Sequence, residues 1–196
     1  MRNYNIIICF ICLVTMCSCS KRQNNVHLMT ELRNLRKMDI KFPINDLIKL
    51  KANNTNIEYP FDLSDLKLVV FSDSAECNLC AINKMYEWND YITLSSKSKG
   101  KFSVYFIISC TAQSLPDVKA AFYNSGLHTS IYIDIHNSFY RLNPEFPSER
   151  MFHTFLLDEN NHIILVGNPL HNSNVKVLLT DILEDRIGDL SIISPN

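Results

Sequence analysis

Blocks of apolar and polar positions predict strands and helices that alternate along this chain. Residues 68–71 form an uninterrupted apolar run, which is typical of a central parallel strand buried on both faces. After a polar stretch at residues 72–76, apolar side chains recur at helical spacing over residues 79–95. The pattern therefore predicts a strand near residues 67–72, a short turn, and a helix.

The remaining pattern extends this alternation to the end of the chain. The expected elements are a strand at 102–109, a helix at 115–124, a strand at 130–134, a helical turn at 137–142, a hairpin of strands at 154–157 and 163–166, and a helix at 175–187. Alternating strands and helices favour a parallel core, and the terminal hairpin makes the sheet mixed. The predicted fold class is α/β, with three layers in which helices flank a central mixed β-sheet.

The segments before the first core strand have weaker patterns. Residues 26–38 fit a short amphipathic helix, whereas residues 44–56 fit either a strand or a brief helix. We expect residues 28–60 to form an N-terminal extension that packs on a domain formed by residues 61–190.

The N-terminus carries the pattern of an export sequence. Arg2 precedes an apolar run at residues 6–16, which is short for a bilayer span and typical of a signal peptide. The following Cys17-Ser-Cys-Ser-Lys resembles a bacterial lipoprotein signal, and this resemblance implies that Cys19 is lipidated. Residues 1–19 would then be the signal peptide and 20–27 a polar tether. A plain cleaved signal peptide and an uncleaved anchor are the alternatives, and each of them exports the domain.

Composition narrows the functional classes. The chain has 196 residues, 46% of them hydrophobic and 20% charged, which suits one domain with appendages. A formal net charge of −1 and the lack of a basic cluster in the sequence argue against nucleic acid as a partner. Beyond the first twenty residues the cysteines are Cys77, Cys80 and Cys110. Export places them where disulfides persist.

Cys77 and Cys80 form a C-x-x-C pair at the start of the first predicted helix. The unpaired N–H groups of a helix start stabilise a thiolate, so a cysteine there is a nucleophile. A second cysteine three residues on resolves the mixed disulfide. The pair therefore predicts a redox site, with a structural disulfide as the alternative. Cys110 ends an apolar strand and is expected to be packed, with a third redox partner as the alternative.

This order, with C-x-x-C after the first core strand, resembles the thioredoxin fold. The additional helix and strand resemble the branch of membrane-tethered periplasmic thiol-disulfide oxidoreductases related to ResA and TlpA, and the whole is similar to thioredoxin-like lipoproteins common in Bacteroidetes. The matching segments are Leu68-Val-Val-Phe, Cys77-Asn-Leu-Cys, Ile131-Tyr-Ile-Asp, Met151-Phe-His-Thr-Phe-Leu-Leu-Asp and Ile163-Ile-Leu-Val-Gly. The resemblance implies that Cys77 attacks and Cys80 resolves.

The sequence departs from that family at two places. Glu76 stands where an aromatic residue usually precedes the first cysteine, and its carboxylate disfavours the thiolate, which indicates a reductase or a slow exchanger. Neither Phe152 nor His153 is the cis-proline that the family places opposite the cysteines, so we expect a trans peptide there. The resemblance places Glu76, Phe152, His153 and Thr154 at the substrate-binding surface.

These observations predict an exported thiol-disulfide oxidoreductase, anchored by lipid in the envelope of a Gram-negative bacterium and facing the periplasm. Its partners would be a protein thiol or disulfide, the membrane and a membrane electron donor, with no cofactor and no metal. The first alternative is a redox-inactive binding or scaffold lipoprotein whose cysteines form a structural disulfide. The second is a copper(I) metallochaperone in which His153 joins the two thiolates.

Overall fold

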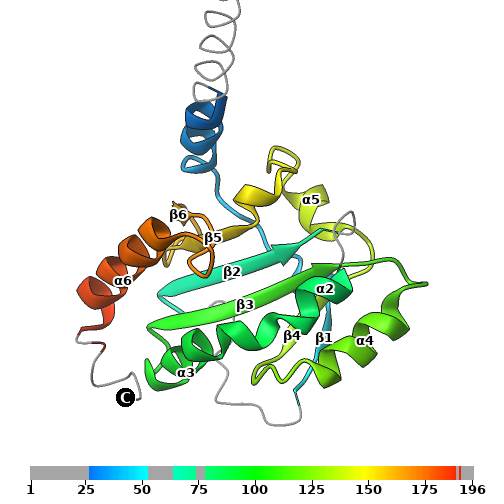
Figure 1. Cartoon of the computed structure of the whole chain (residues 1–196). Coiled ribbons are helices and arrows are strands. Elements are labelled where there is room, and N and C mark those ends of the chain that lie inside the picture. The colour runs from blue at the N-terminus through cyan, green and yellow to red at the C-terminus, as the bar shows by residue number, and fades with distance from the viewer. Residues whose placement is uncertain (1–26, 53–63, 74–77, 189, 191–196) are drawn as a thin grey trace, which may run out of the picture. The chain divides into compact units, whose positions relative to one another are not determined.

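The computed structural model describes residues 27–52, 64–73, 78–188 and 190. The chain divides into two compact units, Met1–Lys37 and Met38–Asn196. In the first unit the described residues include a helix at 27–35, which agrees with the expected helix at 26–38. The second unit contains the sheet and the elements around it (Figure 1). No helix among the described residues has the length and apolar character needed to cross a membrane.

A mixed sheet forms the centre of the second unit, with the strand order β1-β4-β3-β2-β5-β6 among the described residues. The strands are β1 (Ile48–Leu50), β2 (Leu66–Ser72), β3 (Phe102–Ser109), β4 (Ile131–Asp134), β5 (Thr154–Leu157) and β6 (Ile163–Val166). Strands β2, β3 and β4 run parallel, while β1, β5 and β6 pair antiparallel with their neighbours. The predicted parallel core and terminal hairpin are confirmed.

Helical elements connect these strands. They are η1 (Ile44–Asp46), α2 (Asn78–Asn83), η3 (Met85–Trp88), α3 (Asn89–Lys97), α4 (Leu115–Asn124), α5 (Ser138–Leu142), η4 (Arg150–Phe152) and α6 (Ser173–Ile187). The stretch at 44–56, for which a strand and a brief helix were the alternatives, contains both, because the 3-10 turn η1 leads into the edge strand β1. Residues 53–56 lie outside the described part of the chain.

The expectation of one continuous helix at 79–95 was wrong. A 3-10 segment, η3, separates α2 from α3, and its Met85 and Trp88 are both buried. In a 3-10 helix, side chains three residues apart lie on the same face, so this tighter winding turns both residues into the core. The same spacing also occurs on one face of an α-helix, which is why the apolar pattern did not reveal the break.

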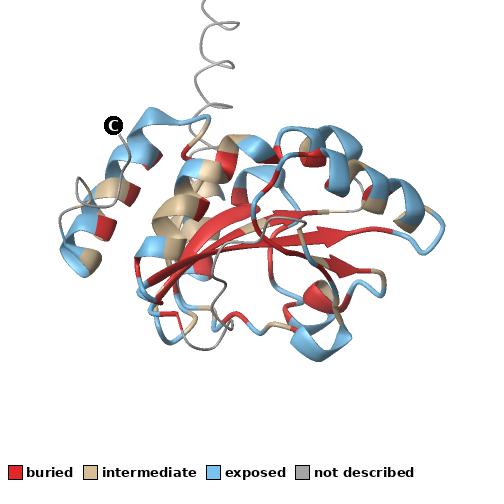
Figure 2. Cartoon of the chain, turned by 90° about the horizontal axis from the view of Figure 1, so that it is seen from below, coloured by how far each residue is buried: buried red, intermediate tan, exposed pale blue. Residues whose placement is uncertain are grey.

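Both faces of the sheet are covered, and the strands are largely buried (Figure 2). On one face, Val104, Phe106 and Ile108 of β3 belong to a core cluster that includes buried side chains of α2, η3, α3, α4 and α6. Alternate residues of a strand point to opposite faces, so Tyr105 and Ile107 lie on the other. That second face also carries a cluster of aromatic rings, in which the ring centroids of Phe71 and Phe139 of α5 are 4.7 Å apart.

The structure therefore has three layers, with a mixed sheet between helical elements, as an α/β fold requires. The central β-α-β unit is β2, the α2–α3 segment and β3, and the antiparallel hairpin with helix α6 completes the order. Parallel strands β2, β3 and β4 end at one edge of this sheet. The candidate site is built at that edge.

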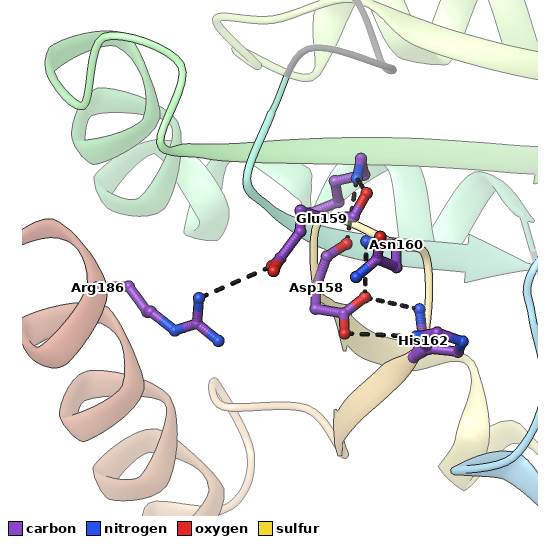
Figure 3. A network of polar contacts seen from close by, with 6 residues as sticks. Asp158, Glu159, Asn160, His162 and Arg186 are labelled. Atoms are coloured by element: carbon purple, nitrogen blue, oxygen red, sulfur yellow. Dashed lines mark hydrogen bonds and ion pairs between the residues drawn. The ribbon is translucent and has the colours of Figure 1, made fainter.

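A polar network holds the turn that joins β5 to β6, at the end of the hairpin away from the candidate site (Figure 3). Asp158 Oδ1 accepts the backbone N–H groups of Asn160 and His162, both at 2.9 Å, which shapes the turn. The Nζ of Lys67, a residue only 2% exposed in β2, donates to the carbonyl oxygens of Asp158 at 3.1 Å and Glu159 at 3.4 Å. The buried ammonium thus stabilises the turn from the neighbouring strand.

Candidate functional site at the C-terminal edge of the parallel strands

Polar and thiol side chains lie where the central strands begin or end. Asp73 follows β2, Cys110 follows β3 and Asp134 is the last residue of β4. Antiparallel β5 starts at the same edge, because Thr154 pairs with Val70 and the Phe71 N–H donates to the His153 carbonyl oxygen at 2.8 Å. In a parallel sheet this is the edge where binding and catalytic groups usually gather.

Cys80 lies in the first turn of α2 and is exposed to solvent. Its neighbour Leu79 is 42% exposed, whereas Ile82 is fully buried and anchors the helix on the core. The helix begins at Asn78, the residue that follows Cys77 in the sequence. Cys77, Glu76 and the lipidation candidate Cys19 lie outside the described residues, so their predicted roles stay predictions.

Cys110 differs from Cys80 in its surroundings. It is a free thiol, 4% exposed, and its N–H donates to the Asp134 carbonyl oxygen at 3.1 Å. Burial raises the pKa of the Cys110 thiol, a hydrogen bond with Ser114 lowers it, and the charge of Asp134 raises it further, with a net increase. A buried thiol that holds its proton is a poor nucleophile, as expected for a packed cysteine.

Asp134 is a structural carboxylate that the sequence did not single out. It is fully buried, and its Oδ1 accepts the N–H groups of Ser138 at 2.9 Å and His136 at 3.2 Å, while Oδ2 accepts that of Phe139 at 2.9 Å. These bonds satisfy N–H groups at the start of α5, which have no partner within the helix. An aspartate three residues before an expected helical turn is the pattern that could have indicated this role.

A hydrogen-bonded chain links Asp73, Tyr140 and His153. The Tyr140 hydroxyl of α5 donates to Asp73 Oδ2 at 3.1 Å, and its oxygen lies 3.2 Å from His153 Nε2. His153 is only 3% exposed, and its ring lies 5.1 Å from Phe71 and 6.3 Å from Phe146 between ring centroids. The sequence indicated His153 as a site residue but missed Asp73 and Tyr140, which it meets only in the folded chain.

The predicted docking segment at residues 152–154 is buried. The exposed fractions of Phe152, His153 and Thr154 are 2%, 3% and 7%. Its backbone is also engaged, since the His153 N–H donates to Arg150 O at 3.1 Å and the Thr154 carbonyl accepts from the Gly167 N–H at 2.8 Å. All peptide bonds between described residues are trans, which confirms the expectation for this segment.

Metal-ligating side chains do not cluster within the described part of the chain. No group of three or more His, Cys, Asp or Glu residues there is arranged to hold an ion. At the site itself, the Nε2 atom of His153 is already in contact with the Tyr140 hydroxyl. The arrangement offers an exposed thiol on α2 and, at the same sheet edge, a buried imidazole that is linked through the Tyr140 hydroxyl to the Asp73 carboxylate.

No protein-family model and no curated protein sequence matches this chain. Several solved structures resemble it. An uncharacterized thioredoxin-like protein from Porphyromonas gingivalis is 16% identical over 62% of this chain and 76% of its own, with a TM-score of 0.41. The thioredoxin domain of a thiol-disulfide oxidoreductase from Bacteroides vulgatus is 16% identical over 69% of this chain and 93% of its own, with a TM-score of 0.44. A mutant of peroxiredoxin Q from Xanthomonas campestris is 11% identical over 76% of this chain and 99% of its own, with a TM-score of 0.45. Such loose likeness assigns no role to any residue.

Proposed function

We propose that this protein is an exported, lipid-anchored thiol-disulfide oxidoreductase that reduces disulfides of other proteins through Cys77 and Cys80. The observation that supports the proposal most strongly is the position of Cys80, which is exposed in the first turn of the helix that begins directly after Cys77. That helix follows the central strand β2, beside the edge described above. The buried Cys110 serves the packing of this edge and takes no part in exchange.

The exchange proceeds in two steps. The Cys77 thiolate attacks one sulfur of a substrate disulfide, forming a mixed disulfide and releasing the first substrate thiolate. Cys80 then attacks the Cys77 sulfur, which releases the second substrate sulfur and leaves a Cys77–Cys80 disulfide. The substrate gains two electrons and the pair loses them, so a membrane donor of the dithiol class must reduce the pair again. Glu76 keeps Cys77 a moderate nucleophile because its charge opposes thiolate formation.

The test is reduction of glutathione disulfide or insulin by the purified, pre-reduced protein. We expect exchange by the natural protein, near-complete loss in Cys77→Ser, and a trapped mixed disulfide in Cys80→Ser because the resolving thiol is missing. Cys110→Ala is the matched control, since it removes a buried thiol and should retain exchange. Equal rates for the natural protein and Cys77→Ser would refute the proposal.

Membrane attachment through Cys19 has a separate test. Cells that express the full chain and are fed radioactive palmitate should label the protein, and Cys19→Ser should abolish the label. Cys17→Ser is the control, because it removes the neighbouring cysteine and leaves Ser18 before Cys19. Label that persists in Cys19→Ser would assign the anchor to another residue.

The burial of residues 152–154 supports a second candidate, a binding or scaffold lipoprotein in which the two cysteines form a structural disulfide. In that case the backbone edge that the family offers to substrates is used internally, and the pair stabilises the fold. The two candidates differ in the reduction potential of the pair, because a structural disulfide resists cellular reductants.

A further inference from the structure

Residues 138–146, which comprise α5 and the loop after it and which we call the lid, pack on the side chains at the end of β2 and just before β5 (Figure 1). The ring of Phe71 in β2 contacts that of Phe139 at 4.7 Å between centroids. The His153 ring lies 5.1 Å from Phe71 and 6.3 Å from Phe146. The lid therefore contributes to the burial of His153, which is only 3% exposed.

The lid has little stability of its own. Helix α5 has five residues, far fewer than an isolated helix needs, and its outer side faces water, with Leu142 44% exposed. An ion pair of 3.8 Å joins Arg141 to Asp46, but both side chains are more than half exposed, so it adds little. Buried contacts must therefore keep the lid in place, and the Asp134 carboxylate supplies those at the start of α5.

At the other end of α5, the lid is joined to residues 38–43, which we call the strap. The Asn143 side chain is buried, and its Oδ1 accepts the Lys41 N–H at 2.9 Å. Its Nδ2 donates to the carbonyl oxygens of Lys41 and Phe139, both at 2.8 Å. The ring of Phe42 in the strap lies 6.0 Å from that of Phe139 between centroids. One side chain, that of Asn143, thus bonds both backbone groups of a strap residue and the helix end.

The strap is fixed elsewhere on the fold. Asp39 forms a β-bridge with His162, and the Ile40 N–H donates to the Asn161 carbonyl oxygen at 3.2 Å. The Ile40 side chain is fully buried. These contacts attach the strap to the β5–β6 hairpin independently of the lid. Loss of the Asn143 side chain should therefore release the lid and leave the strap in place.

We propose that the lid, held closed by the strap through Asn143, opens transiently and that polypeptide disulfides bind in the open state. This inference rests on the proposed function, whose exchange reaction it regulates. With the lid open, the rings of Phe71 and His153 form an aromatic surface at the sheet edge from which the chain continues to α2, and this surface suits the apolar side chains of a polypeptide. A ligand that binds only the open state has its affinity reduced by the open fraction. A small hydrophilic disulfide needs no such surface and reacts in either state.

The first test is amide hydrogen exchange of the full-length protein and of Asn143→Ala. The substitution removes three buried hydrogen bonds, so the lid should open on the order of tenfold more often. Exchange should accelerate by this factor at the Arg141 and Phe146 N–H groups, which bond carbonyl oxygens within or next to the lid. Modification of the His153 ring by diethyl pyrocarbonate, located by peptide mass, should accelerate in parallel.

Asn172→Ala is the matched control. It also removes an asparagine side chain that bonds backbone groups, at 3.0 and 3.2 Å, but these belong to Asn174 and Val175 at the start of α6. Exchange in the lid and modification of His153 should stay at their natural rates. If Asn143→Ala does not fold, Phe42→Leu replaces it, since it removes only the ring that packs on the lid.

The second test compares the reduction of insulin with that of glutathione disulfide. Asn143→Ala should accelerate the reduction of insulin by the same factor as lid opening and leave that of glutathione disulfide unchanged. Unchanged hydrogen exchange in the lid, or equal acceleration in Asn172→Ala, would overturn the lid. Faster opening with no gain for insulin over glutathione disulfide would overturn its role in substrate binding. Failure of the natural protein to reduce either disulfide, with lid opening still sensitive to Asn143→Ala, would overturn the proposed function instead.

Discussion

At the scale of single residues, the buried Asp134 carboxylate connects the end of β4 to the start of α5. Three backbone N–H groups converge on its two oxygens at 2.9 to 3.2 Å. A short helix has little stability of its own, so α5 depends on this cap and on the packing of Phe139. Since α5 carries Tyr140, the cap also determines where the Asp73–Tyr140–His153 chain can form.

Asp134→Ala tests this dependence. Removal of the carboxylate leaves N–H groups without a partner in a buried place, so we expect the free energy of unfolding to fall by about 2 kcal/mol. Asp185→Ala, at an exposed position of α6, is the control and should change stability by less than about 0.5 kcal/mol. The measurement is urea denaturation at neutral pH. Equal losses in the two variants would contradict the capping role.

Cys110 predicts how stability changes in alkaline solution. Because burial raises its pKa in the folded chain, the native thiol keeps its proton to higher pH than the unfolded thiol, which titrates near about 8.5. Between the two pKa values the unfolded state binds fewer protons, so the free energy of unfolding falls as pH rises above about 8.5. Cys110→Ala should flatten this fall above about pH 8.5 and leave the pH dependence at lower pH unchanged. Parallel curves for both proteins would exclude the thiol as the cause.

At the scale of elements, the connection from β6 to α6 depends on the absence of a side chain at Gly167. Its φ of +126° is rare for any other residue, and an added Cβ would lie 2.8 Å from a methyl carbon of Val175 in α6. Gly188, which ends α6, also has a positive φ, of +100°, but nothing lies within 4 Å of its Cβ position. The two glycines share the backbone strain and differ in the contact.

Gly167→Ala should therefore destabilise the protein more than Gly188→Ala. Strain of about 1–2 kcal/mol is common to both, and the clash with Val175 adds about 1–3 kcal/mol at Gly167 alone. Thermal unfolding of the two variants beside the natural protein measures the difference. Equal melting temperatures would show that α6 moves away from the added methyl group at no cost.

Lys67 joins β2 to the hairpin turn at residues 158–161. Lys67→Met keeps the length of the buried stem but removes the ammonium donor from the carbonyl of Glu159 and from that of Asp158, which keeps only the Asn161 N–H, so we expect a loss of about 1–3 kcal/mol. Lys176→Met, on the exposed side of α6, is the control. Hydrogen exchange should be faster at the His162 N–H, which bonds Asp158, in Lys67→Met only. Unchanged exchange there would contradict this role.

These elements show what the sequence could predict. The bounds expected for β3, α4, β5 and β6 agree with the structure, because turn residues on both sides mark where an apolar run or a helical pattern begins and ends. The burial of Lys67 was not predicted, since a lysine beside a strand is usually solvated. Its partners lie 91 and 92 residues away in the sequence and meet it only through the pairing of β2 with β5.

The sequence likewise indicated only some residues of the candidate site. Cys80 was predicted from its position at a helix start, which is a local feature of the sequence, and His153 was predicted from the family resemblance. Asp73 and Tyr140 were missed, since they are 67 residues apart and their hydrogen bond depends on α5 folding over the edge of the sheet. Spacing along the chain indicates which elements bear reactive groups, but the sheet order decides which polar groups surround them.

At the scale of the whole molecule, the protein combines an exposed thiol on α2 with a buried segment at the start of β5. The mixed sheet brings the ends of β2, β3 and β4 to the start of β5, so these features share one edge. An exchanger with a buried docking segment must meet its substrates mainly through side chains near α2, where Leu79 is 42% exposed. We therefore expect slow and broadly selective exchange rather than tight recognition of one backbone.

The measurement that tests the central claim most directly is a redox titration of the full-length protein in glutathione buffers, with thiols trapped by alkylation and located by peptide mass. The account predicts one disulfide, between Cys77 and Cys80, that forms and opens reversibly at a potential above about −300 mV, while Cys110 stays a thiol throughout. A Cys77–Cys80 disulfide that stays closed below that potential, or a pair that never forms a disulfide, would contradict it.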